Sequence, residues 1–93
     1  MTVQNELRLL PWSGPDGKPC YLSTDDRDGY MSRLADNIES VQLGMAARLL
    51  EQAQEVLDDS AAEPEQLRVL AAGLAGALGD TLRVATSRGG RLR

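Results

Sequence analysis

Residues 29–57 of this 93-residue chain read GYMSRLADNIESVQLGMAARLLEQAQEVL, and their periodicity limits what the rest of the chain can fold into. Apolar residues recur at steps of three or four, the spacing of one face of an α-helix. A second apolar line runs beside the first at a spacing of seven. The first line is Leu34, Ile38, Val41, Met45, Leu49, Ala53 and Val56, and the second is Leu43, Leu50 and Leu57. A helix with so wide an apolar face is usually covered on two sides.

A second helix is predicted over 64–87. Pro64 suits a first helical turn, and the pair Gly89–Gly90 is expected to end the helix. The loop between the two helices is only a few residues long, which predicts an antiparallel helical hairpin. One face of the second helix carries Leu67, Leu70, Leu74, Leu78, Leu82 and Ala85.

The segment before the helices predicts a β-hairpin over 7–23. Pro15-Asp16-Gly17 has the residue types of a tight turn, and β-favouring residues flank it on both sides. Pro11 restricts the first strand to a sheet edge because it lacks an N–H. A two-stranded hairpin is marginal alone in water, so it must pack on the helices or on another chain. Asp25, Asp26 and Asp28 are expected to cap the first helix.

The predicted fold is therefore a single α+β domain over 1–93, mostly α, with a leader over 1–6, the hairpin, two helices over 29–57 and 64–87, and a basic tail over 88–93. Only 3% of the residues are aromatic, and 15 leucines must supply most of the core. Because a domain of this size buries about 60–70% of its unfolded surface, a homodimer is expected. The predicted dimer interface comprises Leu43, Ala47, Leu50, Leu57, Gly73 and Gly76.

The residue inventory argues against several chemistries. The chain has no histidine, so the commonest general base and metal ligand is missing. Its single cysteine, Cys20, makes neither an intramolecular disulfide nor a thiolate cluster for zinc. We therefore expect no enzymatic activity, no cofactor and no metal site.

The longest uncharged run, Val69–Gly79, is shorter than the roughly 20 residues of a membrane span. A cytoplasmic protein without membrane contact is expected.

Charge divides the chain into an acidic body and a basic end. Residues 1–66 carry 13 acidic and 5 basic side chains, a net charge of −8, whereas residues 67–93 carry 1 and 5, a net charge of +4. An acidic body repels phosphate, so the main fold is not expected to bind nucleic acid directly. The basic end, with Arg88, Arg91 and Arg93, has two interpretations. It either places cations favourably at a helix C-terminus or contacts nucleic acid.

Two further features allow alternatives. Gly73, Gly76 and Gly79 each weaken a helix by about 1 kcal/mol relative to alanine. They either admit a second helix at close range or lie on a tolerant surface.

The aromatic residues gather at the hairpin, and such residues often dominate protein interfaces. The predicted partner-binding residues are Trp12, Tyr21, Leu22 and Tyr30, although Trp12 alternatively pins the hairpin onto the helices.

The segments Leu10–Ser13, Gly17–Ser23 and Gly29–Asp36 resemble the small acidic BldB-type developmental regulators of streptomycetes, as do the size, acidity and layout of residues 12–90. The resemblance implies a homodimeric, non-enzymatic regulator of sporulation or antibiotic production that acts beside helix-turn-helix transcription factors of the WhiJ type. Tyr21 would belong to the hairpin of that family. The expected function is thus to dimerise and bind such a transcription factor. The alternative is direct nucleic-acid binding through the arginine-rich tail of a dimer.

Overall fold

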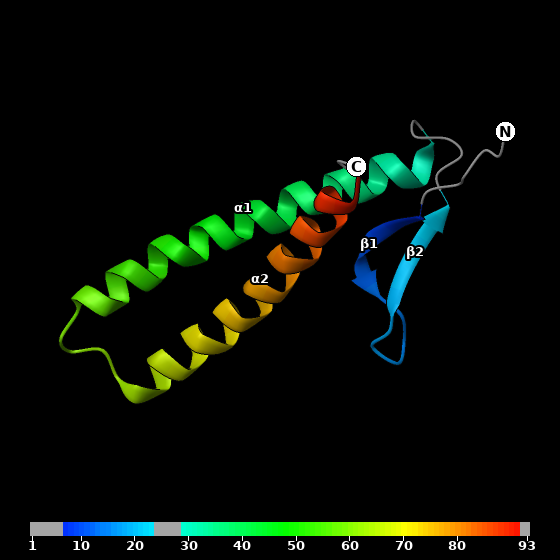
Figure 1. Cartoon of the computed structure of the whole chain (residues 1–93). Helices are drawn as coiled ribbons and strands as arrows, with labels where there is room; N and C mark the ends of the chain where they lie inside the picture. The colour runs from blue at the N-terminus through cyan, green and yellow to red at the C-terminus, as the bar shows by residue number, and fades with distance from the viewer. Residues whose placement is uncertain (1–6, 24–28, 92–93) are drawn as a thin grey trace, which may run out of the picture.

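The computed structural model describes residues 7–23 and 29–91, and side chains up to residue 89. Two strands, β1 (Leu7–Ser13) and β2 (Pro19–Ser23), precede two long helices, α1 (Tyr30–Asp58) and α2 (Pro64–Arg91). The strands form an antiparallel hairpin, and the helices pack against each other with opposite chain directions (Figure 1). The predicted α+β hairpin-and-helix-pair fold is confirmed. The expected caps Asp25, Asp26 and Asp28 lie outside the described residues.

The turn of the β-hairpin follows from its sequence. Gly14 and Gly17 are joined by a hydrogen bond from the Gly17 N–H to the Gly14 carbonyl, 3.0 Å long, and the Gly14 N–H donates to the Lys18 carbonyl at 2.8 Å. Gly17 has a φ of 80°, a conformation that glycine adopts without strain. The register pairs Leu9 with Tyr21, and it shifts between Leu9 and Ser13. Pro11 lies in this irregular stretch, where its missing N–H breaks no regular ladder.

One predicted boundary is wrong. The helix α2 does not end at Ser87 but continues through Gly89 and Gly90 to Arg91. Glycine ends a helix when it takes a left-handed conformation, and in the described part of the chain only Gly17 has a positive φ. Arg88 is therefore a helical residue rather than the start of a separate tail.

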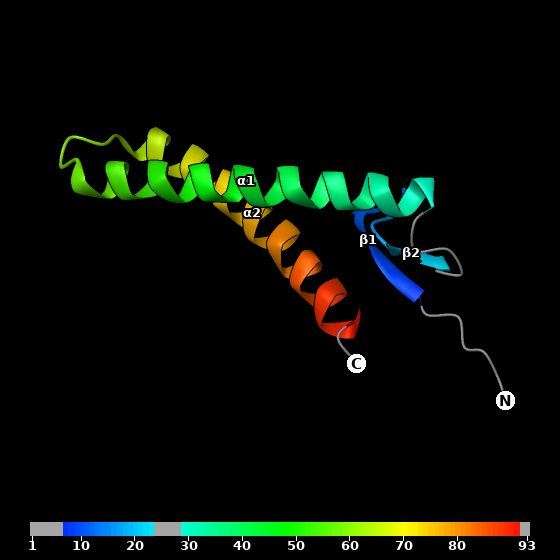
Figure 2. The same cartoon turned by 90° about the horizontal axis from the view of Figure 1, so that it is seen from above.

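The core has two small parts. Near the loop that joins the helices, Ala53 and Val56 of α1 pack against Leu70 of α2. At the other end, where the helices diverge, β1 lies against both of them (Figure 2). Leu10, Ala35 and Val84 are buried, one from each of the three elements. The hairpin thus packs on the helices as predicted, and it does so through β1.

The molecule is elongated, with extents of 64 × 25 × 22 Å and a radius of gyration of 17.0 Å. A compact domain of 93 residues would have a radius of gyration of about 12 Å. Its accessible surface is 7014 Å², against roughly 5,200 Å² for a compact monomer of this mass. The chain alone therefore leaves an unusually large surface in contact with solvent.

Candidate functional site

Much of this surface is apolar. Several side chains that form the predicted helix stripes are exposed, and the rest of the exposed large apolar residues lie mainly on the hairpin and at the start of α1. The exposed large apolar residues are Leu7, Tyr21, Tyr30, Met31, Val41, Met45, Leu50, Leu57, Leu67, Val69, Leu78 and Leu82. Monomeric proteins rarely expose apolar surface in large contiguous patches, so how these residues group decides what the surface can do.

The register of the helix pair sets that grouping. A Cβ atom on Gly73 of α2 would lie 3.4 Å from Leu49 Cδ2 of α1, so these residues face each other. One to two turns closer to the loop, Leu70 packs with Ala53 and Val56. As the residue numbers rise along α1, those of the contacting residues fall along α2. The helices are antiparallel, and these five residues mark the line along which they touch.

The exposed leucines of the two helices, together with the half-buried Leu43 and Leu74, lie on one side of this line. Leu50 and Leu57 each follow a contact residue of α1 directly in sequence, and Leu74 follows one of α2, so each is rotated by about 100° around its helix from the contact. In antiparallel helices this rotation carries both sets to the same side of the pair. Together they form a single surface, called here the leucine face: Leu43, Leu50 and Leu57 of α1, and Leu67, Leu74, Leu78 and Leu82 of α2.

The opposite side of the helix pair near the loop is more polar. Arg48, Gln52 and Glu55 each precede a contact residue directly, so they are rotated by the same angle in the other direction, and all three are exposed. Val41 and Met45 of α1 also lie on this side, closer to the hairpin, and Val69 of α2, which directly precedes Leu70, lies here near the loop; all three are exposed. The leucine face presents five exposed leucines from the two helices and is the larger apolar surface of the pair.

The residues predicted for a dimer interface divide between these surfaces. Leu43, Leu50 and Leu57 lie on the leucine face, and Ala47 lies beside it. Gly73 instead lies at the contact between the chain's own helices, where its missing side chain leaves room for Leu49. Gly76 lies on the opposite side of the pair, and no atom from outside its own helix comes within 4 Å of where its Cβ would be. The structure thus separates the two glycines from the leucines with which they were grouped.

The residues predicted for partner binding also separate. Tyr21 pairs with Leu9, and Leu22 pairs with Arg8. Residues that pair across strands point to the same side of a sheet, and Arg8 is buried against the helices. Leu22 therefore lies on the inner side of the hairpin, and Tyr21 lies on its outer, exposed side. Trp12 is half-buried, and Tyr30 is exposed at the start of α1. Cys20 is a half-buried free thiol.

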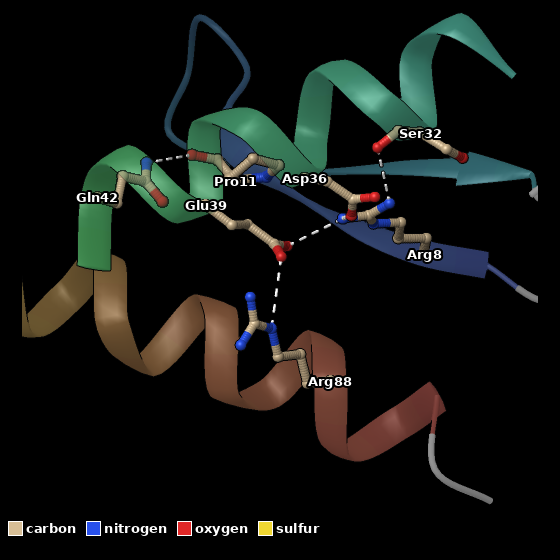
Figure 3. Close-up of polar contacts among 7 residues, drawn as sticks. All are labelled: Arg8, Pro11, Ser32, Asp36, Glu39, Gln42 and Arg88. Carbon is tan, nitrogen blue, oxygen red and sulfur yellow. Dashed lines mark hydrogen bonds and ion pairs between the residues drawn. The ribbon is translucent and has the colours of Figure 1, made fainter. Parts of the chain in front are cut away.

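A buried ion-pair cluster joins the hairpin to both helices, and the sequence did not predict it (Figure 3). Glu39 of α1 is 1% exposed, and its carboxylate lies 3.3 Å from an Arg8 guanidinium nitrogen of β1 and 3.6 Å from Arg88 Nε of α2. Arg8 also donates to the Ser32 carbonyl at 3.1 Å and to Asp36 Oδ1 at 2.6 Å. The amide of Gln42 donates to the Pro11 carbonyl at 2.9 Å. These contacts fix β1 in the space between the diverging helices.

This cluster changes the interpretation of the basic end. Arg88 pairs with Glu39 and is half-exposed, so part of its charge is balanced inside the fold. Arg83 likewise lies 3.4 Å from Asp80 and donates to the Pro11 carbonyl at 3.5 Å. The side chain of Arg91 and all of Arg93 lie outside the described part of the chain. Arg88, one of the three arginines predicted to contact nucleic acid, is therefore paired within the fold.

The described side chains contain no group of three or more His, Cys, Asp or Glu residues that could hold a metal ion. In comparisons with known proteins, no family model, curated protein or solved structure matches the chain.

Proposed function

We propose that this chain is a non-enzymatic regulatory protein that acts by binding other polypeptides: a second copy of itself and a transcription factor of the helix-turn-helix type. The single observation that carries the proposal is the exposed apolar surface, above all the leucine face. Burial of apolar surface stabilises association by about 25 cal/mol per Å² before the costs of association are counted. A surface that the chain cannot bury within itself is best explained by a protein that covers it.

A membrane is the other environment that would cover leucines. Among the described helices, α2 is long and apolar enough to cross one by length and composition, contrary to what the longest uncharged run suggested. However, Asp80 and Arg83 lie within that helix, and Arg83 is bound to the Pro11 carbonyl of β1. Insertion of α2 would pull it away from the hairpin and from α1. A protein partner leaves these contacts intact.

The transcription factor is the part of the proposal that rests on the resemblance to BldB-type regulators and on charge. Residues 1–66 carry a net charge of −8, which complements the basic DNA-facing side of such a factor. Tyr21 and Leu9, paired on the outer side of the hairpin, offer an aromatic and an aliphatic anchor away from the leucine face. Direct nucleic-acid binding by the basic end has less support because Arg88 is paired with Glu39.

The test measures binding of the full chain to purified helix-turn-helix proteins from the same genome by isothermal titration calorimetry. Tyr21→Ala is expected to weaken binding by at least about tenfold, since large exposed aromatic residues carry much of the energy of interfaces. Its melting temperature should change little, because the ring is 56% exposed in the unbound chain. Equal losses of binding and stability would assign Tyr21 to the fold instead. If no helix-turn-helix protein binds, this part of the proposal is wrong.

A further inference from the structure

We propose that the leucine face is the surface on which a second copy of this chain binds, helix pair against helix pair, through an isologous contact. This inference rests on the self-association in the proposed function and specifies its surface. In such a contact the same residues come from both copies, so the face must be able to pack against itself. Three properties of the leucine face meet that requirement.

The first property is area. The chain exposes 7014 Å², which is about 1,800 Å² more than a compact monomer of its mass. A protein–protein interface of standard size removes about 800 Å² from each partner. This excess is spread over the whole chain, and the leucine face contributes to it through five leucines that are 41–76% exposed. The five most exposed residues of the face are leucines on both helices, so a partner that covers them must extend across the pair. Those residues are Leu50, Leu57, Leu67, Leu78 and Leu82.

The second property is the absence of charge. An isologous contact brings like residues close together around its twofold axis, where a charged side chain would meet its own copy. The leucine face consists of seven leucines, so it creates no such repulsion. The polar side of the pair carries Arg48 and Glu55, which the same contact would take out of water. Self-association is therefore expected on the leucine side.

The third property is the pattern along α2. Leu67, Leu74 and Leu78 are spaced by seven and four residues, and Ala71 and Ala75 lie between them on the exposed side of the helix. This is the spacing with which helices pack side by side in bundles. Because alanine side chains are short, they leave gaps between the leucines, and leucines from a facing helix can insert there. The four helices of two copies would then enclose one continuous apolar core.

Sedimentation equilibrium of the full-length chain tests the inference. Wild type should be a dimer at tens of micromolar, and Leu50→Asp should raise the dimer dissociation constant by at least about 100-fold, because each copy then carries a carboxylate into the interface. The matched control is Val41→Asp. Val41 is 60% exposed and Leu50 is 57% exposed, and both lie on α1, but Val41 is on the other side of the pair. The control should dimerise like wild type.

Each result of this experiment either supports or contradicts the inference. A monomeric wild type, a dimeric Leu50→Asp protein, or a Val41→Asp protein that alone is monomeric would each overturn the inference. If circular dichroism shows that Leu50→Asp is unfolded, Leu57→Asp gives the answer, since Leu57 is 76% exposed and at the end of α1. Binding of the transcription factor by a monomeric wild type would leave the hairpin part of the proposed function standing.

Discussion

Glu39 illustrates how much a single residue contributes to this fold. Its carboxylate is almost fully buried, and guanidinium groups from β1 and from α2 approach it, so one side chain links three elements. Buried ion pairs add little net stability when they form, because both charges lose water, but removing one partner leaves the other buried and uncompensated. Without Glu39, Arg8, which is 4% exposed, would keep only the largely exposed Asp36 as an acidic partner, and Arg88 would lose its carboxylate.

Glu39→Ala is therefore expected to lower the free energy of unfolding by about 3–5 kcal/mol. The matched control is Asp36→Ala, which removes the other carboxylate that pairs with Arg8. Asp36 is largely exposed, so solvent already screens its charge, and the expected loss is smaller. Urea denaturation at one fixed protein concentration measures both. Equal losses would mean that burial of Glu39 does not matter.

At the scale of the element, α2 combines a leucine repeat with glycines that weaken it. Gly73 has a packing reason, because Leu49 of α1 fills the space where a larger side chain would lie. Gly76 has no such reason within the chain, since the space around it is open. Of the two interpretations of these glycines, close approach of a second helix applies to Gly73, whereas Gly76 lies on an open surface of the chain.

Gly76→Ala is expected to stabilise the protein by about 1 kcal/mol, because alanine favours the helix and meets no neighbour. Gly73→Ala should gain less, since the added methyl group must fit against Leu49. Chemical denaturation of both variants measures the difference, and sedimentation equilibrium measures the dimer. A loss of stability in Gly76→Ala together with a weaker dimer would show that a second helix packs closely at Gly76.

At the scale of the whole molecule, the elongated shape links folding to association. A rod 64 Å long with two small core regions cannot hide its leucines by itself, so folding and association should be linked. A protein that folds as a dimer has a melting temperature that rises with its concentration. With an unfolding enthalpy of about 0.7 kcal/mol per residue, a tenfold increase in concentration should raise the melting temperature by about 4 °C.

Differential scanning calorimetry at two concentrations measures this shift. Wild type should show it, and Leu50→Asp, with its dimer contact disrupted, should melt at one temperature across the same range. A concentration-independent wild type would contradict linked folding and association.

The elements of this fold could be predicted because each has a local cause. The periodicity of 29–57 and the turn residues Pro15 to Gly17 act within a few residues of the structure they form. The ion-pair cluster could not, since Arg8, Glu39 and Arg88 are distant in sequence, and an acidic residue in a charged helix is usually solvated. Glu39 lies four residues after Ala35 on the same row of α1, but only the structure shows that this row is buried.

The end of α2 was misjudged for a related reason. A pair of glycines predicts a helix end only if the chain turns there, and the contact of Arg88 with Glu39 keeps the last turns of α2 against the fold. The same applies to the predicted site. The spacing of the leucines groups them on one side of each helix, but the sides on which Gly73, Gly76 and Leu22 lie depend on the register between elements.

The way the hairpin is attached determines where the fold opens locally. β1 carries the packing on both helices and the buried arginine, whereas β2 is held mainly by its ladder with β1. Local opening should therefore begin at β2, whose amide hydrogens would exchange with solvent well before those of the helices. β2 can then separate from β1 and pair with it again while the rest of the chain stays folded, so Tyr21 lies on a strand whose backbone can adjust to a partner.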